Sequence, residues 1–343
     1  MVRLDRVARV VLTAAAVGFL VYYVDPSAMM EAVADADPWW IAAAVALLPA
    51  NVWLDAVMWH KLFLRVRPAT SFRESFGAML AGFSLGFFTP GRAGELAGRA
   101  FYLQHPDRWE TAAVVIVQRL YDTAVAVSVG AVALFINRIE DVLPIDLVWD
   151  VLAVAGVLIG GVLVAAGLAP GVARRWLVPV LPKSWQPRLD FLGRLSARDG
   201  AIALGLAAAR YAVYVTQFFL LLRALEYGPV LMAYAGIGLV FFAKFLIPSV
   251  TLMDLGVREG AAVFFLDWLG FSEAAALNAS LMLFAVNVVL PSAAGIRFVM
   301  KLRLGNSEPV THSEGYPTAE IPEKSVSGAL KERAHRELEG HPE

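Results

Sequence analysis

Long apolar runs constrain this chain more than any other feature of its sequence. A helix needs about 20 apolar residues to cross the hydrocarbon core of a bilayer, which is about 30 Å thick. Apolar residues fill 59% of the 343 positions and charged residues only 17%, whereas roughly a quarter of a soluble domain is charged. The sequence therefore predicts an all-α polytopic integral membrane protein, with about six spanning helices at residues 7–24, 39–59, 111–136, 147–168, 200–225 and 274–300.

The first apolar run follows a basic start, "RLDRVAR", as a secretory signal peptide would. It ends in "VYYVDP" and lacks the small-residue pattern at which signal peptides are cleaved. We therefore expect residues 7–24 to be a retained spanning helix.

Two further apolar segments, 76–88 and 230–247, each run into a proline and then into a charged stretch that contains glycine. The prolines are Pro90 and Pro248. The first is too short to span, because a segment of 10–14 apolar residues is typical of re-entrant helices. The second and its charged stretch lie between acids, Glu226 before them and Asp267 and Glu273 after them, which indicates that the chain returns to the side it entered from. Both segments are therefore predicted to open helical hairpins that enter the membrane and return.

The distribution of Lys and Arg predicts the orientation, because basic residues collect on the cytoplasmic side of membrane proteins. Bases gather before residue 7, at 61–73, at 174–198 and at 301–303, whereas 25–38 and 226–229 contain none. We expect residues 1–304 to form the transmembrane domain, in the cell membrane. The pattern of bases places the N-terminus and the C-terminal tail, 305–343, in the cytoplasm. The flanks of each hairpin then lie on one side, which is what a re-entrant segment requires.

The order of these segments repeats with opposite orientation. Spans 39–59 and 111–136 flank the first hairpin, and spans 200–225 and 274–300 flank the second. Locally, "TPGRAGELAGRAFYL" resembles "PSVTLMDLGVREGAAVFFL". Inverted repeats with broken helices that meet near the bilayer midplane are a recurring plan of transporters. We therefore predict an inverted repeat with two re-entrant hairpins.

Charged residues within the two hairpins are candidates for a lipid-binding site. Arg92, Glu95 and Arg99 follow Pro90 and Gly91 at spacings that share one helix face, and paired arginines bind phosphate well. A surface ion pair in a cytoplasmic loop fits this pattern equally. The matching cluster after Pro248, with Gly256 as its glycine, fits either a second half of the site or an extracellular loop; its charges are Asp254, Arg258 and Glu259.

Ionisable residues also lie inside the apolar runs. Arg119 and Asp122, in "VQRLYD", are three residues apart within the span 111–136. A charge at this depth costs about 3 kcal/mol or more without a partner, so it indicates either a functional site or an ion pair that joins two helices. Arg210 and Lys244 are secondary candidates for a cavity, because each needs an anionic partner inside the membrane.

Other classes of function find little support. The net charge of −1 gives no field for nucleic acid, and the absence of cysteine excludes thiol chemistry and Cys-ligated metals. The five histidines show no metal-binding spacing, and no nucleotide-binding or catalytic motif occurs. We expect no cofactor and no metal, and we do not expect an enzyme.

Three motifs in order, "PGRAGELAGRA", "VQRLYD" and "LGVREG", resemble the lysylphosphatidylglycerol synthase transmembrane-region family. These flippase-like membrane proteins occur alone or fused to an aminoacyltransferase domain. The resemblance covers about residues 3–303 and implies a domain that moves a phospholipid or similar polar lipid between leaflets. It assigns Pro90, Gly91, Gly94, Glu95 and Arg99 to the first hairpin, Arg119 and Asp122 to an intramembrane pair, and Gly256, Arg258 and Glu259 to the second hairpin.

The sequence departs from the family pattern after Pro248, where "SVTLMD" replaces a glycine-rich turn, and nothing after Arg303 resembles a synthase domain. The leading hypothesis is a lipid translocase whose partners are membrane lipids with anionic headgroups, with a separate enzyme supplying a modified lipid. The alternatives are a membrane enzyme or subunit that acts on an aminoacyl- or sugar-linked lipid, and a scaffold that recruits partners through residues 305–343.

Overall fold

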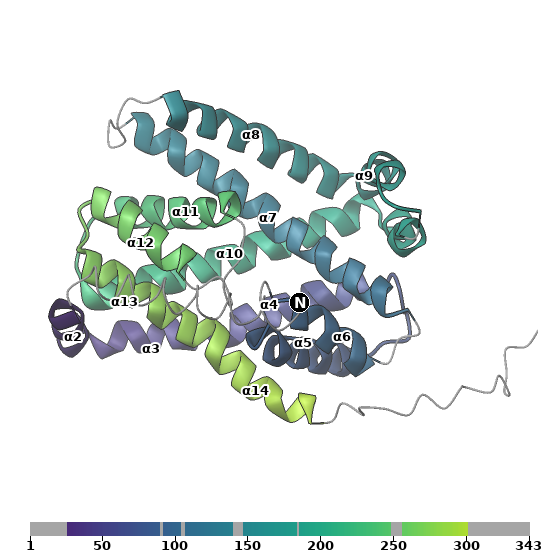
Figure 1. The fold of residues 1–343 in the computed structure, drawn as a ribbon, viewed down its shortest axis with the longest axis horizontal. Helices are drawn as coiled ribbons and strands as arrows, with labels where there is room; N and C mark the ends of the chain where they lie inside the picture. The colour runs from purple at the N-terminus through teal and green to yellow at the C-terminus, as the bar shows by residue number, and fades with distance from the viewer. Residues whose placement is uncertain are drawn as a thin grey trace, which may run out of the picture. The chain divides into compact units, whose positions relative to one another are not determined.

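The computed structural model describes residues 26–89, 92–103, 107–139, 147–183, 185–247 and 256–300, all within one compact unit, Met1–Leu302. Every regular element in these ranges is helical (Figure 1). The first half contains α2 (Pro26–Ala34), α3 (Pro38–Ala46), α4 (Leu48–Phe63), α5 (Phe72–Phe87), α6 (Ala93–Leu103) and α7 (Arg108–Ile139). The second contains α8 (Leu147–Leu168), α9 (Pro170–Leu177), α10 (Ala197–Leu225), α11 (Val230–Leu246), α12 (Val257–Trp268), α13 (Glu273–Phe284) and α14 (Leu290–Val299).

Five stretches of helix are long and apolar enough to span a membrane, which confirms the all-α polytopic class. They are Pro38–Phe63, Arg108–Ile136, Leu147–Leu168, Ala197–Leu225 and Glu273–Val299. Each lies within three or four residues of a predicted span. The predicted span 7–24 and the predicted tail 305–343 lie outside the described residues.

Two of these spans change their helical geometry. The first breaks at Leu47, between α3 and α4, where Pro49 enters the first turn of α4. The last contains a π-helical turn, Ala285–Val289, between α13 and α14. Proline removes a backbone hydrogen bond and kinks a helix, and single π turns occur frequently at functional sites.

Helices α5 and α6 form the first hairpin, and glycines set how closely its arms pack. A Cβ atom on Gly98 would lie 2.7 Å from the Cα atom of Gly82, and one on Gly94 would lie 2.2 Å from the carbonyl oxygen of Leu85. The two contacts run in opposite directions along the helices, so the arms are antiparallel. At 1.5 Å per residue the arms are about 24 and 17 Å long, shorter than a bilayer core.

We expect Gly98→Ala to destabilise this hairpin. The new methyl group would meet the backbone of Gly82 and Ala81, which cannot rotate away, and overpacking of this kind costs about 1–3 kcal/mol. Thermal unfolding in detergent, followed by intrinsic fluorescence, should show a lower midpoint. The matched control is Gly161→Ala in α8, where a Cβ meets open space; an equal drop in both variants would contradict this account.

Helices α11 and α12 form the second hairpin in the same way. Gly236 of α11 lies against Leu266 and Leu269 at the far end of α12, and Gly228, just before α11, lies against Phe271, just after α12. The hairpin therefore begins and ends at one end of the unit. The connection 248–255, which includes Pro248 and Asp254, lies outside the described residues.

The packing between the two halves is reciprocal. Helix α5 of the first hairpin packs on α14, where a Cβ on Gly295 would meet the carbonyl oxygen of Leu80. Helix α11 of the second hairpin packs on α7, where Gly130 lies against Phe242. Helices α4 and α10, which precede the two hairpins, pack on each other. Such reciprocal contacts are expected of two inverted repeats, which are related by a pseudo-two-fold axis in the membrane plane.

Two large apolar cores form, one around each hairpin, and polar residues lie between them. One core gathers around α5 and α6, using α7 up to Val125 and α10 up to Ala207. The other gathers around α11 and α12, using α7 from Val127 and α10 from Val215. The boundary between them falls where the sequence places its charges on α7 and α10. A polar layer therefore lies between the two cores.

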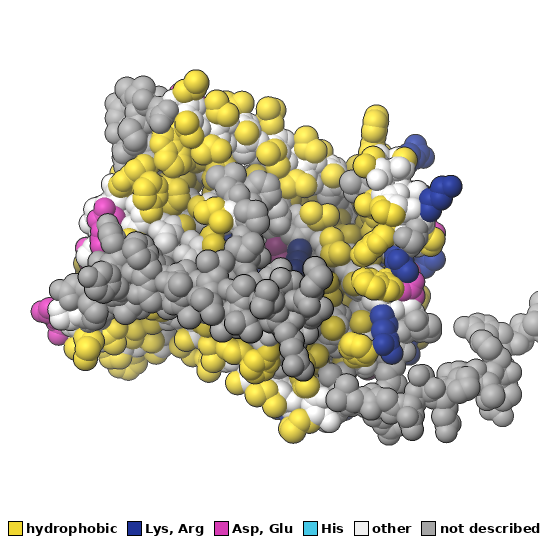
Figure 2. Space-filling model, in the orientation of Figure 1, with side chains coloured by type: hydrophobic (Ala, Val, Ile, Leu, Met, Phe, Trp, Pro, Cys, Tyr) yellow, Lys and Arg dark blue, Asp and Glu magenta, His cyan; other side chains and the backbone are white. Residues whose placement is uncertain are grey.

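Charges also separate the two ends of the unit. At one end, Arg65 pairs with Asp199 at 2.7 Å, which joins the end of α4 to the start of α10, and Arg67 donates to the carbonyl of Leu103, where α6 ends. This basic end also carries α9. At the opposite end, Asp37 before α3 donates its backbone N–H to Ala224, near the end of α10. Figure 2 shows most of the dark-blue bases gathered at one end and most of the acids at the other, and most described side chains between them on this face are apolar.

Candidate functional site

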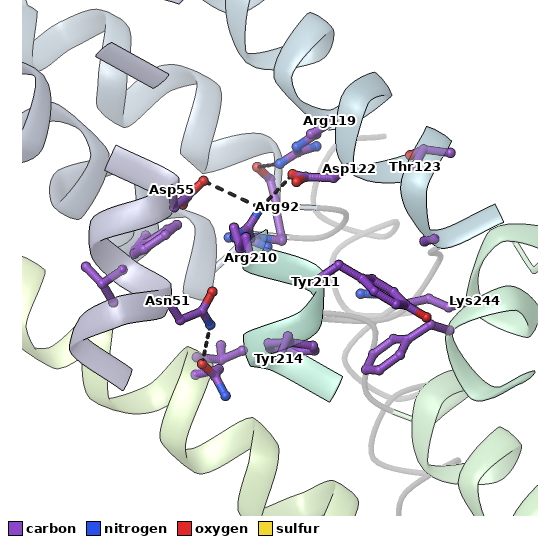
Figure 3. A pocket seen from close by; sticks show the side chains of 16 residues that line it. Asn51, Asp55, Arg92, Arg119, Asp122, Thr123, Arg210, Tyr211, Tyr214 and Lys244 are labelled. Atoms are coloured by element: carbon purple, nitrogen blue, oxygen red, sulfur yellow. Dashed lines mark hydrogen bonds and ion pairs between the residues drawn. The ribbon is translucent and has the colours of Figure 1, made fainter. Parts of the chain in front are cut away.

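A cavity of about 380 Å³ lies in the polar layer, and helices of both halves line it. Its wall combines charged residues with apolar and aromatic ones (Figure 3). The basic side chains are Arg92, Arg119, Arg210 and Lys244, and the acidic ones are Asp55 and Asp122. The remaining wall is formed by Asn51, Val52, Phe83, Thr123, Ala126, Tyr211, Tyr214, Phe241, Asn287 and Val288.

Arg210 of α10 is held between two carboxylates from other helices. Its Nη1 atom lies 2.6 Å from Oδ2 of Asp122 on α7 and 3.5 Å from Oδ1 of Asp55 on α4. The Asp55 side chain is 5% exposed and that of Asp122 is 31% exposed. Arg210 therefore ties three helices together and still presents its guanidinium group to the cavity.

Glu95, at the start of α6, holds three arginines. Its Oε2 atom lies 2.8 Å from Nη2 of Arg119 and 3.2 Å from Nη2 of Arg92, and its Oε1 atom pairs with Arg99. Glu95 and Arg99 are 4% and 1% exposed, and the Arg99 guanidinium stacks 4.6 Å from the Trp59 ring centroid. The carboxylate thus fixes two cavity arginines from behind the wall.

Gln118 connects the two ionic groups into one network. Its side-chain oxygen accepts from Arg99 at 2.9 Å, and its amide nitrogen donates to Oδ1 of Asp55 at 2.5 Å. The network contains four guanidinium groups and three carboxylates, and Lys244 adds a further cation to the cavity wall. Since charges interact strongly in a low-dielectric interior, this excess of positive charge favours an anionic ligand.

Both hairpins contribute a cation from the end nearest their turn. Arg92 immediately precedes α6, and Lys244 lies in the last turn of α11. Arg92 has φ = 56°, a left-handed conformation that is uncommon for residues other than glycine. Such strain occurs at ligand-binding sites, where the surrounding structure fixes a side chain in place.

The second hairpin has a buried ion pair of its own. Arg258 and Glu259 of α12 pair with each other and are 4% and 1% exposed. Arg258 donates to the Ser280 hydroxyl of α13 at 2.9 Å and to the Tyr214 hydroxyl of α10 at 3.5 Å. Glu259 also accepts from the backbone N–H of Gly256, which has φ = 95°. This pair anchors α12 to its neighbours, as the Glu95–Arg99 pair anchors α6.

The predicted residues therefore separate into two groups. Arg92, Arg119, Asp122, Arg210 and Lys244 line the cavity. Glu95, Arg99, Arg258 and Glu259 are buried in the two hairpin ion pairs, and Gly94 lies at the tight start of α6, where its N–H donates to the Thr89 hydroxyl at 2.6 Å. Pro90, Gly91, Pro248 and Asp254 lie outside the described residues.

Arg119 and Asp122, which the family resemblance assigns to an intramembrane pair, bind different partners. The two do not pair among the described contacts; Arg119 pairs with Glu95 of the hairpin and Asp122 with Arg210. Three polar residues that the sequence did not mark as site candidates, Asn51, Asp55 and Asn287, also line the cavity, where the Asn51 amide donates to Asn287 at 2.5 Å. Their signal was a polar residue in the middle of an apolar span.

Comparison with known proteins gives a family but no individual relative. The family described as "Lysylphosphatidylglycerol synthase TM region" matches residues 6–295. No curated protein and no solved structure matches the chain.

Proposed function

The chain belongs to the lysylphosphatidylglycerol synthase transmembrane-region family, and on that premise we propose that it translocates a phospholipid or other polar lipid between membrane leaflets. The family is a membrane domain linked to lipid-related functions, and this chain is a multi-pass membrane protein. The proposal concerns what the domain does with the lipid.

One observation carries the proposal. Four cations from α7, α10 and both hairpins converge on one cavity in the polar layer between two apolar cores. Among the described residues, two carboxylates share its wall. A phosphodiester headgroup has the charge and the hydrogen-bond acceptors that guanidinium groups bind best. We therefore assign the headgroup phosphate to Arg92 and Arg119, with Arg210 and Lys244 as further cations of the cavity wall.

The barrier to lipid exchange is the transfer of a charged headgroup through hydrocarbon, where it would lose its hydration. A polar cavity replaces the lost water with fixed donors and lowers that barrier. The volume of about 380 Å³ suits a headgroup rather than a whole lipid. In this mechanism the acyl chains stay in the bilayer beside the apolar helix faces while the headgroup crosses.

The proposal also includes the orientation of the protein in the membrane and its lipid and enzyme partners. The basic end would face the cytoplasm, with both chain termini there, in the cell membrane. Anionic phospholipids would be the ligands, and a separate enzyme would supply any modified lipid. The alternative, an enzyme acting on the lipid, needs a carboxylate free to act as base; Glu95 and Glu259 are both held in buried ion pairs, which favours transport without a chemical step.

The proposal predicts that Arg119→Gln slows transport without unfolding the protein. The Arg119 side chain is 39% exposed, and Glu95 keeps its two other arginines. A lost charge-assisted hydrogen bond to the headgroup should lower the rate roughly 10–100-fold.

The measurement is dithionite quenching of a fluorescent phosphatidylglycerol in proteoliposomes. Arg119→Lys, which keeps the charge but loses the bidentate geometry, should fall between wild type and Arg119→Gln. Equal rates in all three proteins would show that Arg119 does not meet the lipid.

A further inference from the structure

A second cavity, of about 360 Å³, lies at the basic end between α4 and α10. It is separate from the cavity in the polar layer, and the two share no lining residue. Its charged wall consists of Lys61, Arg65 and Asp199. Its apolar wall consists of Met58, Leu62, Leu64, Pro68, Leu195, Ile202, Ala203 and Leu206.

The charged wall favours an anion. Lys61 is exposed, and Arg65 is 43% exposed while its Nη2 atom pairs with Asp199 at 2.7 Å. Arg194 donates to the backbone carbonyl of Arg65 at 3.1 Å, which adds a third base beside the cavity. Asp199 also caps the start of α10 through Ser196, so its charge is already shared. The bases retain donors for a phosphate.

The apolar wall distinguishes a lipid from a free anion. Eight of the eleven lining residues are apolar, and four of these eight are buried: Met58, Leu62, Leu195 and Ala203. An inorganic anion gains nothing from such a wall, whereas an acyl chain gains about 25 cal/mol for each Å² of surface that it buries. The combination of bases and apolar side chains is that of a phospholipid site at a membrane surface.

The two cavities follow each other along the same pair of helices. On α4, Asp55 lines the central cavity, and Met58 and Leu62, on the same helix face, line the second one. On α10, Arg210 lines the central cavity, and Leu206 and Ala203 line the second. Met58, three residues after Asp55 on α4, is fully buried. Methionine is flexible enough to repack when a neighbour moves.

We propose that the cavity at Lys61 and Arg65 is a second phospholipid site, which binds an anionic lipid from the leaflet at the basic end and loads it into the central cavity along the α4–α10 seam. The loading role rests on the proposed translocase function; the binding site itself does not. The ligand class is a phospholipid with a net negative headgroup.

The test uses the full chain in phosphatidylcholine nanodiscs that contain a photoreactive phosphatidylglycerol. Peptides that contain residues 58–68 and 195–206 should carry the adducts. The double variant Lys61→Gln/Arg65→Gln should lower this labelling roughly tenfold. The matched control, Arg175→Gln/Lys183→Gln, removes two exposed bases outside the cavity and should leave it unchanged. Unchanged labelling in the first variant would overturn the site.

Two further arms keep the result interpretable. Ile202→Trp fills the apolar part of the cavity without altering its charge and should also lower labelling, which guards against misfolding of the charge variant. Excess phosphatidylglycerol should displace the probe and excess inorganic phosphate should not; displacement by phosphate would overturn the lipid assignment.

Transport assays then distinguish lipid binding at the second site from its proposed role in loading the central cavity. Lys61→Gln/Arg65→Gln should raise the half-saturating fraction of phosphatidylglycerol roughly tenfold and leave the maximal rate unchanged. Labelling that persists in a protein without any transport would leave the site standing and reject the translocase. Transport that proceeds with unaltered lipid dependence in the double variant would reject the loading role.

Discussion

Glu95→Gln is expected to destabilise the protein by about 3–5 kcal/mol and to abolish lipid exchange. The substitution removes one carboxylate that pairs with three arginines, and it leaves Arg99, which is 1% exposed, without the carboxylate that it contacts directly. Loss of one member of a buried ion pair costs this much because the remaining charge stays desolvated. The change also releases Arg92 and Arg119 from their positions in the cavity wall.

Thermal unfolding in detergent, followed by intrinsic fluorescence, measures the stability, and the liposome assay measures exchange. The matched control is Glu31→Gln on α2, where the carboxylate is exposed, and it should unfold at the wild-type midpoint. A Glu95→Gln protein with that same midpoint would show that Arg99 does not need the carboxylate. The role of Glu95 in holding three arginines would then be wrong.

Arg210→Gln is expected to have the second largest effect, a loss of about 3 kcal/mol or more together with a severe loss of exchange. Without the guanidinium group, Asp55 and Asp122 would face each other across α4, α7 and α10, and Asp55 is 3% exposed. Two carboxylates so near each other in a buried site cannot both stay ionised without a large cost in free energy. The unfolding midpoint measures this loss, and Arg73→Gln, at an exposed position, serves as the control.

A second substitution should restore part of the lost stability. Asp122→Asn in the Arg210→Gln protein removes one of the two uncompensated charges, so the double variant should be more stable than Arg210→Gln alone. Wild type, Arg210→Gln, Asp122→Asn and the double variant form a double-mutant cycle. Its coupling energy measures the interaction between Asp122 and Arg210. A double variant that is the less stable of the two would contradict the pairing.

Local pattern predicted a large part of the fold. Apolar runs of about 20 residues located five described spans, because length and hydropathy alone decide whether a helix can cross a bilayer. Proline and glycine after a short apolar segment predicted both hairpins, whose arms are α5–α6 and α11–α12. The i,i+4 spacing of Glu95 and Arg99 predicted their ion pair, because residues four apart share a helix face.

Long-range pairing could not be predicted in the same way. Asp122 and Arg210 are 88 positions apart, and Gln118 and Asp55 are 63 apart; helix rotation and depth decide such contacts, and neither is visible in a single sequence. The resemblance between the hairpin motifs suggested similar roles for Arg92 and Arg258. The structure places Arg92 in the cavity and buries Arg258 beside Glu259, because Arg258 lies inside α12 whereas Arg92 precedes α6.

The central claim is that the cavity binds an anionic headgroup and carries it between leaflets. The most direct measurement compares the dithionite-accessible decay of fluorescent phosphatidylglycerol and fluorescent phosphatidylcholine in proteoliposomes of wild-type protein, with protein-free liposomes as the baseline. We expect exchange of phosphatidylglycerol well above the baseline and several-fold faster than that of phosphatidylcholine, because four cations and two carboxylates line the cavity among the residues that the structure describes. Exchange at the protein-free rate for both lipids would contradict the account.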